Sequence, residues 1–290
     1  MRRANSLTQA ELLQYDRDGF VTRETVFSKD ELAQLRQATD EAIKEATELG
    51  HRGSTYMLDG KRFVDEGFFT IQFENGSRGE AIRVIEPVYQ LHPLLEALVD
   101  DPRLVEPMID LVGQAQISLW TAKLNLKSAY VGSGFGWHQD SPYWVHDCDH
   151  VDLLPNVMLA FDEATEANGC FRAIRGSHNR GCLPGTNDGT ELGGFYTDPR
   201  LFDESDQVAF VVPAGSLIFF NPHVVHGSLP NQSDQPRRAI ILTYQPAGFP
   251  ALKSRAVRNV AMSPAKPNAD ILVSRATGSL STTRMPRRKD

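Results

Sequence analysis

The chain has 290 residues, of which 41% are hydrophobic and 23% charged, so its composition is that of a globular protein and not of a disordered, collagenous or fibrous one. Residues 251–290 hold nine Lys and Arg against two Asp and Glu, which leaves 21 basic and 35 acidic residues, a net charge of −14, in the first 250. Such an acidic body argues against nucleic acid or an anionic membrane surface as its partner.

Two helix starts can be recognised near the N-terminus. Thr8 followed by Glu11, and Ser28 followed by Glu31, have the spacing of a capping box, and each pair precedes apolar residues at a helical period. Gly50 is expected to end the second helix. The expected elements of this part of the chain are helices over 8–18, 29–49 and 93–112 and a short strand over 19–22.

Two stretches lack a clean hydrophobic period and are expected to be long loops. Residues 51–80 are rich in Gly, charged and aromatic residues, and residues 178–207 are polar. Long loops in compact domains are usually functional. We therefore expect both loops to form a lid that selects the substrate, with Phe68, Phe69 and Tyr143 contributing to a partly apolar pocket.

After residue 115 the sequence changes to short β-type runs separated by Gly, Pro and Asn. Many short strands with such turns predict a mainly β fold, a cupin-like double-stranded β-helix or jelly roll, instead of alternating strands and helices. The helices that precede the strands are expected to cover its larger sheet. The predicted strands are 116–126, 134–139, 156–162, 170–174, 208–212, 216–220 and 238–244.

The cysteines and the apolar runs indicate where the protein works. Cys148, Cys170 and Cys182 lack CxxC spacing, so we expect neither a disulfide framework nor a structural zinc site. No apolar run approaches the roughly 18 residues of a membrane span, and the first residues lack the apolar core of a secretory signal. We expect one cytoplasmic domain over 1–290, with 251–290 a basic C-terminal extension, and leave open whether it forms a homodimer.

The run GWHQD holds the first residues that suggest chemistry. In an extended segment, side chains two apart point to the same side, so His138 and Asp140 can face one metal ion. His226 follows 88 positions later, at the expected end of an apolar strand. Two neutral imidazoles and a carboxylate on one face leave adjacent coordination sites open on an octahedral metal, as in non-haem iron oxygenases. Structural zinc sites close with four ligands instead.

Two positions near His226 offer alternative candidates, one for a metal ligand and one for a residue that binds a carboxylate. His223, three positions before His226, is a rival ligand, but we expect it to hydrogen-bond behind the ligands. A keto-acid cosubstrate with a distal carboxylate needs a cation, and the fork of a guanidinium suits it. Arg237 and Arg238 begin the next strand, where alternation lets only one face inward. We predict that Arg237 does so.

Three runs of the sequence carry a family resemblance: HQD at 138–140, NGCFRAIRGSH at 168–178 and AGSLIFFNPHVVHGSLPNQSDQPRR at 214–238. Over roughly residues 10–250 the chain resembles the phytanoyl-CoA dioxygenase superfamily, which includes ectoine hydroxylase and many natural-product oxygenases. The resemblance implies Fe(II) as the cofactor and 2-oxoglutarate and O₂ as cosubstrates. It places the iron ligands at His138, Asp140 and His226 and the carboxylate clamp at Arg237.

The resemblance implies three more contacts in the site. Asn125, on the strand before HQD, and Ser228, two positions after His226, match residues that contact the cosubstrate. Trp144 matches an aromatic residue that lines the iron pocket in the ectoine hydroxylase branch. The run RGSH at 175–178 departs from the usual PGSH, so the turn before Gly176 is expected to differ.

The intact carboxylate favours one type of reaction. Halogenating members of the superfamily carry Gly or Ala in its place, so Asp140 points to hydroxylation or a related oxidation. The expected function is an Fe(II)- and 2-oxoglutarate-dependent dioxygenase that hydroxylates an unactivated C–H of a small organic molecule in specialised metabolism, releasing succinate and CO₂. The alternatives are a metal-dependent hydrolase or isomerase on a cupin-like barrel, and a non-catalytic ligand-binding barrel.

Overall fold

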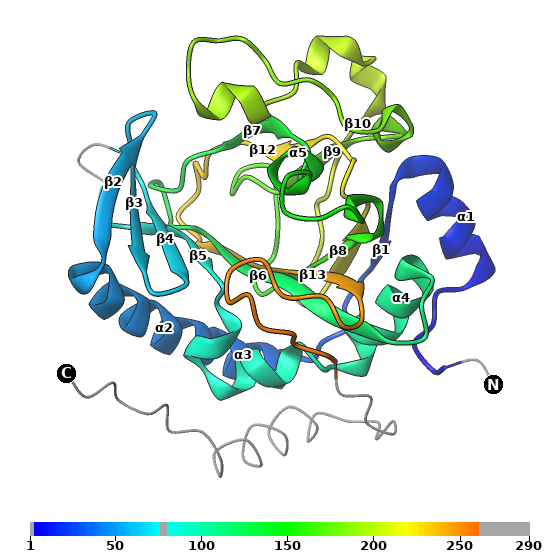
Figure 1. Ribbon diagram of the computed structural model, residues 1–290, viewed down its shortest axis with the longest axis horizontal. Helices are drawn as coiled ribbons and strands as arrows, with labels where there is room; N and C mark the ends of the chain where they lie inside the picture. The colour runs from blue at the N-terminus through cyan, green and yellow to red at the C-terminus, as the bar shows by residue number, and fades with distance from the viewer. Residues whose placement is uncertain (1–2, 76–79, 261–290) are drawn as a thin grey trace.

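The computed structural model describes residues 3–75 and 80–260, so most of the expected basic extension, residues 261–290, lies outside the described residues. Two antiparallel sheets pack against each other, and helices cover the outer face of the larger sheet (Figure 1). The strand order is β1-β11-β8-β13-β6-β5-β4-β3-β2 in the larger sheet and β10-β9-β12-β7 in the smaller one. The predicted jelly roll is confirmed.

The structure gives the following bounds. The α-helices are α1 (Gln9–Asp18), α2 (Lys29–Arg52), α3 (Pro93–Leu98), α4 (Pro102–Val112) and α5 (Ser141–Trp144). The strands are β1 (Phe20–Arg23), β2 (Ser54–Leu58), β3 (Lys61–Glu66), β4 (Phe69–Phe73), β5 (Ile82–Glu86), β6 (Ile117–Lys127), β7 (Phe135–His138), β8 (Asn156–Ala160), β9 (Phe171–Ile174), β10 (Gln207–Ala209), β11 (Leu217–Phe220), β12 (His226–Ser228) and β13 (Arg237–Pro246). Within the described ranges, no helix is both long and apolar enough to cross a bilayer.

Both predicted capping boxes form. The Thr8 hydroxyl accepts a hydrogen bond from the Glu11 amide, and the Glu11 carboxylate accepts one from the Thr8 amide; Ser28 and Glu31 make the same pair of bonds. The predicted end of the second helix at Gly50 is wrong, because α2 continues to Arg52. Gly50 instead lies inside the helix at a close contact, where a Cβ would lie 3.2 Å from the ring of Phe73.

The expected long loop over 51–80 is also wrong. Most of this stretch forms β2, β3 and β4, which extend the larger sheet from β5 outward (Figure 1). The strands were hidden because β2 is exposed on both faces and therefore has no alternating pattern. Phe68 and Phe69 contact each other with tilted rings and are absent from the pocket lining. The expected loop 178–207 does form, with only short 3₁₀ turns inside it.

Strand alternation divides the core into two layers. Ile240 and Leu242 of β13 point toward the helices and join a cluster that includes Leu35 of α2 and Leu104 of α4. Ala239 and Ile241, on the opposite face of β13, join a second cluster between the two sheets; its other buried strand members are Phe20, Met158, Ala160, Phe171, Ala173, Ile218 and Phe220. The functional residues lie beside this second cluster, inside the barrel.

Candidate iron and 2-oxoglutarate site

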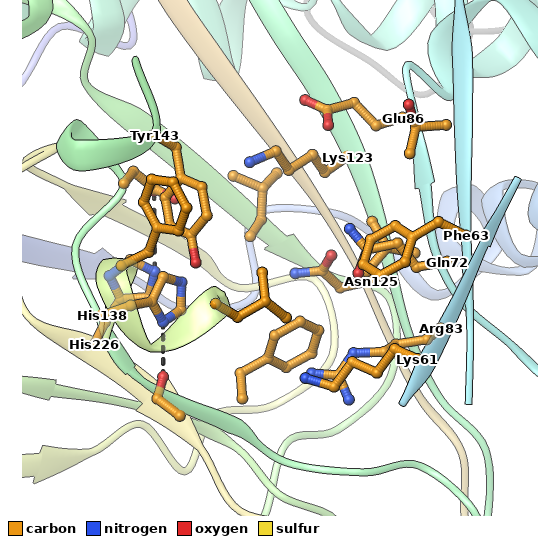
Figure 2. A pocket seen from close by; sticks show the side chains of 18 of the residues that line it. Lys61, Phe63, Gln72, Arg83, Glu86, Lys123, Asn125, His138, Tyr143 and His226 are labelled. Atoms are coloured by element: carbon orange, nitrogen blue, oxygen red, sulfur yellow. Dashed lines mark hydrogen bonds and ion pairs between the residues drawn. The ribbon is translucent and has the colours of Figure 1, made fainter. Parts of the chain in front are cut away.

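Strands β7 and β12 bring His138 and His226 side by side. The two residues are cross-strand partners, and their ring centroids lie 4.2 Å apart (Figure 2). Asp140 follows β7 by two residues, and its Oδ2 lies 3.9 Å from Nε2 of His226. One potential ligand atom from each of the three residues lies within 4.8 Å of the others. The structure therefore brings together the three residues predicted to bind one metal ion.

The path to His226 differs from the prediction. The apolar strand β11 ends at Phe220 in the larger sheet, whereas His226 begins β12 in the smaller one. The intervening turn carries the chain from one sheet to the other, and its Val224 and Val225 are fully buried. These two valines anchor the turn and so hold His226 opposite β7.

Backbone carbonyls fix the orientation of both imidazoles. Nδ1 of His138 lies 2.7 Å from the carbonyl oxygen of Gly136, and Nδ1 of His226 lies 2.9 Å from that of Val224. A carbonyl only accepts, so each Nδ1 carries the proton and donates, which leaves each Nε2 lone pair free for a metal. Burial, followed by the neighbouring His226, lowers the pKa of His138 to about 3, so its imidazole is neutral.

The carboxylate of Asp140 is held by the larger sheet. Asn156 of β8 donates a hydrogen bond of 3.0 Å to Oδ2 of Asp140, and Asn156 in turn accepts one of 2.5 Å from the hydroxyl of Thr243 on β13. Both polar side chains are fully or almost fully buried. The backbone amide of Asp140 also donates to the carbonyl of Pro222, in the turn that leads to His226. These bonds fix the carboxylate relative to both imidazoles.

His223, the rival ligand, lies outside this group. Its Nδ1 lies 2.8 Å from the hydroxyl of Ser141, and its Nε2 lies 2.7 Å from a carboxylate oxygen of Asp152. Both ring nitrogens therefore have partners other than a metal, as the sequence analysis predicted. Ser141 follows Asp140 directly, so His223 braces the segment that carries the carboxylate.

A pocket of about 530 Å³ opens beside the three side chains (Figure 2). The aromatic and apolar residues of its lining include Tyr56, Leu58, Phe63, Phe135, Tyr143, Trp144, Met158, Phe171, Leu192, Phe195, Tyr196, Ile241 and Leu252. His138, Asp140 and His226 all line it, so a metal ion held by them would face the pocket. Such a site can bind a small ligand and a diatomic gas together.

Arg237 is buried in the wall of this pocket, with 3% of its surface exposed. One Nη donates to the carbonyl of Gly169 at 2.9 Å, whereas Nε has no hydrogen-bond partner among the described residues. Burial lowers the pKa of Arg237 to about 10, so it stays charged at neutral pH. Arg238 points the other way and pairs with Asp162 and Asp40. The predicted inward orientation of Arg237 is confirmed.

The other three residues named from the resemblance line the same pocket. Asn125 lies on β6 and Ser228 at the end of β12, both at the pocket wall. Trp144 also contributes to the lining, but only 1% of its surface is exposed, and its indole packs edge-on against Trp120 at 6.3 Å between ring centroids. Trp144 is therefore both a core residue and part of the pocket wall.

Sequence reasoning missed several residues of the pocket. Lys61 and Arg83 enter it from β3 and β5, and Tyr196 enters from the loop 178–207. Lys61 was hidden because its strand was expected to be a loop. Asn156 was missed as well, although a lone amide at the head of an apolar strand is a usable indication of a buried polar contact.

A jelly roll with two histidines and one carboxylate at a pocket inside the barrel is typical of non-haem iron oxygenases. Comparison with known proteins agrees. The family model described as phytanoyl-CoA dioxygenase (PhyH) matches residues 15–239, and the chain belongs to this family. It is a 2-oxoglutarate-dependent dioxygenase whose cofactor is iron.

Individual relatives support the same class. The chain is 27% identical over 261 residues to ectoine dioxygenase from Bordetella parapertussis, covering 83% of this chain and 76% of the relative. It is 26% identical over 191 residues to L-proline trans-4-hydroxylase from Streptomyces griseoviridis, covering 60% and 70%. Among solved structures, EctD from S. alaskensis with 2-oxoglutarate and 5-hydroxyectoine has a TM-score of 0.66 at 23% identity, covering 92% of this chain and 88% of that one.

Proposed function

We propose that the protein hydroxylates an unactivated C–H of a small organic molecule of specialised metabolism, with His138, Asp140 and His226 as the iron ligands. The observation that carries the proposal is the convergence of these side chains on one pocket, with both Nδ1 protons committed to carbonyls. When bound, iron, 2-oxoglutarate and O₂ supply the oxidising chemistry. A hydrolase or isomerase is set aside because the chain belongs to a dioxygenase family.

The proposal assigns the distal carboxylate of 2-oxoglutarate to Arg237. Its side chain is buried and charged, and one of its N–H groups has no partner among the described residues, a state that is costly unless a ligand accepts the hydrogen bond. Ser228 on β12 of the smaller sheet supplies a hydroxyl, and Asn125 on β6 of the larger sheet supplies an amide, both at the pocket wall. Trp144 completes the wall as an apolar surface. The ectoine and proline hydroxylases named above act on small molecules, which agrees with the modest size of the pocket.

The chain's own contribution is to position the substrate and exclude water. The loop 178–207 covers the pocket through Leu192, Phe195 and Tyr196, and Phe195 stacks on Tyr143 at 4.3 Å between ring centroids. This aromatic cover limits solvent access to the reacting groups. The target C–H must lie close to the iron ligands, so the shape of the pocket determines which position is oxidised.

The direct test is succinate formation with a panel of small-molecule substrates. The wild-type protein is expected to convert 2-oxoglutarate to succinate only when Fe(II) is added, and faster when a substrate is present. Asp140→Ala and His226→Ala should each abolish the activity while remaining folded by circular dichroism. Iron-independent turnover, or full activity in either variant, would refute the proposed function.

A further inference from the structure

The pocket has a second polar region, on the side away from the three proposed iron ligands. Figure 2 shows the imidazoles of His138 and His226 on one side of the pocket and the side chains of Lys61 and Arg83 on the other. Lys61 is the first residue of β3, and Arg83 lies in β5. The reaction site described above uses neither cation.

Tyr196 contacts the first of these cations. The Lys61 ammonium donates a hydrogen bond of 3.4 Å to the Tyr196 hydroxyl. Arg83 and Tyr196 line the same pocket, and Figure 2 shows Arg83 on the same side of it as Lys61. Lys61, Arg83 and Tyr196 therefore form one group, which we call the distal cluster.

The positive charge of the distal cluster is only partly compensated. Among residues 3–75 and 80–260, no carboxylate lies within 4 Å of the Lys61 ammonium. Arg83 has 2% of its surface exposed, and its one acidic neighbour within the described part of the chain is Glu74, at 3.9 Å. Its terminal nitrogens donate to Ser133 and Gly134, but its Nε has no partner in the described chain. A buried cation with an unpaired N–H favours the binding of an anion.

The acidic residues of the pocket are engaged elsewhere. Glu86 accepts a hydrogen bond of 2.5 Å from the hydroxyl of Thr121, and Asp147 pairs with Arg255 at 2.9 Å. Asp140 belongs to the proposed iron site. The distal cluster is thus a local positive region inside a protein whose body is acidic, and the low-dielectric walls around it strengthen its attraction for anions.

The distal cluster also lies where the β2–β3 hairpin contacts the loop 178–207. At the turn between β2 and β3, the Asp59 carboxylate accepts hydrogen bonds from the amides of Glu191 and Leu192 at 3.1 and 2.6 Å. Lys61 belongs to this hairpin and Tyr196 to the loop that it touches. A ligand at the distal cluster would therefore contact the hairpin, the covering loop and the barrel together.

We propose that Lys61, Arg83 and Tyr196 bind an anionic group of the substrate, a carboxylate or a phosphate-like group, so that the oxidised C–H lies between this group and the iron ligands. The substrate is then a small organic anion. The inference rests on the proposed function, because Arg237 is taken to be occupied by 2-oxoglutarate.

The test uses small probes for the anionic group. Protein loaded with Fe(II) and 2-oxoglutarate under argon is titrated with acetate, inorganic phosphate and acetamide in a calorimeter. Acetate or phosphate should bind saturably, and acetamide, the neutral analogue of acetate, should not. Preference for acetate identifies a carboxylate, and preference for phosphate identifies a phosphate-like group.

Variants show whether anion binding depends on the distal cluster or only on the net charge of the protein. Lys61→Met should weaken anion binding about tenfold, as expected for one hydrogen bond to a charged group. Lys61→Arg should retain binding, and Lys44→Met, which removes the same charge from an exposed position on α2, should leave it unchanged. The partly exposed position of Lys61 makes its variants tolerable to the fold, and Arg83→Lys provides a second test at the buried cation.

Other outcomes would overturn the inference. These are equal binding of acetamide and acetate, no saturable binding of either anion, or anion binding that Lys61→Met leaves unchanged. A loss of 2-oxoglutarate affinity in Lys61→Met would also overturn it, by assigning the distal cluster to the cosubstrate. The binding of 2-oxoglutarate is measured before the probes are added. If the wild type does not bind 2-oxoglutarate, the proposed function is contradicted, and this result is distinguishable from a failure to bind the anionic probes.

Discussion

His138 and His226 are cross-strand partners, and each donates its Nδ1 proton to the carbonyl of the residue two positions before it in the chain. Both imidazoles are thus oriented by a hydrogen bond from Nδ1 to a backbone carbonyl, which directs each Nε2 toward the pocket. The carboxylate of Asp140 depends instead on the side chain of Asn156. The proposed iron site therefore has one ligand whose orientation can be altered without touching the backbone.

Replacing Asn156 by Ala should weaken iron binding without removing a ligand. The loss frees Oδ2 of Asp140 and leaves the Thr243 hydroxyl without its acceptor. Loss of a partner that orients a metal ligand typically costs about 10- to 100-fold in metal affinity. The Fe(II) dissociation constant, measured anaerobically, checks this, and Thr243→Val should have a smaller effect in the same direction. Unchanged affinity in Asn156→Ala would show that the backbone alone holds the carboxylate.

Arg237 and Arg238 form a matched pair for testing the cosubstrate clamp. Arg237→Lys keeps the charge but loses the bidentate fork, so the KM for 2-oxoglutarate should rise about tenfold or more. Arg238→Lys changes an outward-facing residue paired with Asp162 and should leave this KM near the wild-type value. Steady-state succinate kinetics distinguish the two variants. A larger increase of this KM in Arg238→Lys than in Arg237→Lys would identify Arg238 as the residue that binds the distal carboxylate.

Lys127 should make stability depend on pH. This lysine has 1% of its surface exposed and donates to the carbonyls of Ser133 and Leu229. Burial, helped by the nearby Arg237 and Arg83, lowers its pKa from 10.5 to about 6. Between these values the unfolded chain binds the proton and the folded protein does not, so stability increases as the pH rises.

Lys127→Met removes this dependence and gives the comparison. As the pH rises from 7 to 9, the unfolding free energy of the wild type should increase relative to that of the variant by about 1 kcal/mol per pH unit. Urea unfolding at several pH values measures it, and groups common to both proteins cancel. Parallel curves would mean that Lys127 stays protonated in the fold.

Gly19 ends α1 with a positive φ, and its neighbours leave no room for a Cβ. Its φ is +86°, and an added Cβ would lie 2.5 Å from both His178 and Val224. Gly60 has a similar φ of +75° with nothing within 4 Å, so Gly60→Ala carries the backbone cost alone. We expect Gly19→Ala to lower the unfolding free energy by about 1–3 kcal/mol more than Gly60→Ala does. Equal effects in urea unfolding would exclude a packing role for Gly19.

The part of the site that could be predicted from the sequence is the part with strict local geometry. His138 and Asp140 are two apart on an extended segment, so their shared direction follows from the backbone. The strand alternation that turns Arg237 inward and Arg238 outward follows from the same rule. The many short β-type runs separated by turn residues likewise indicated the jelly roll.

The remaining features depend on tertiary contacts that leave little trace in the sequence. Strand β2 is exposed on both faces, so neither it nor the position of Lys61 on β3 could be recognised. Arg83 is one of two charged residues in the five-residue strand β5, and nothing in its sequence indicates that it lines a pocket. The switch between sheets before His226 is set by the burial of Val224 and Val225, which a strand pattern alone does not reveal.

The central claim is that His138, Asp140 and His226 hold one iron ion to which 2-oxoglutarate can bind. Its most direct test is an anaerobic titration of the protein with Fe(II) in the presence of 2-oxoglutarate, following the weak visible charge-transfer band of the iron chelate. The account predicts a band that saturates at one Fe(II) per chain, requires 2-oxoglutarate and is lost in Asp140→Ala and His226→Ala. The absence of a band in the wild type, or an unchanged band in His226→Ala, would contradict it.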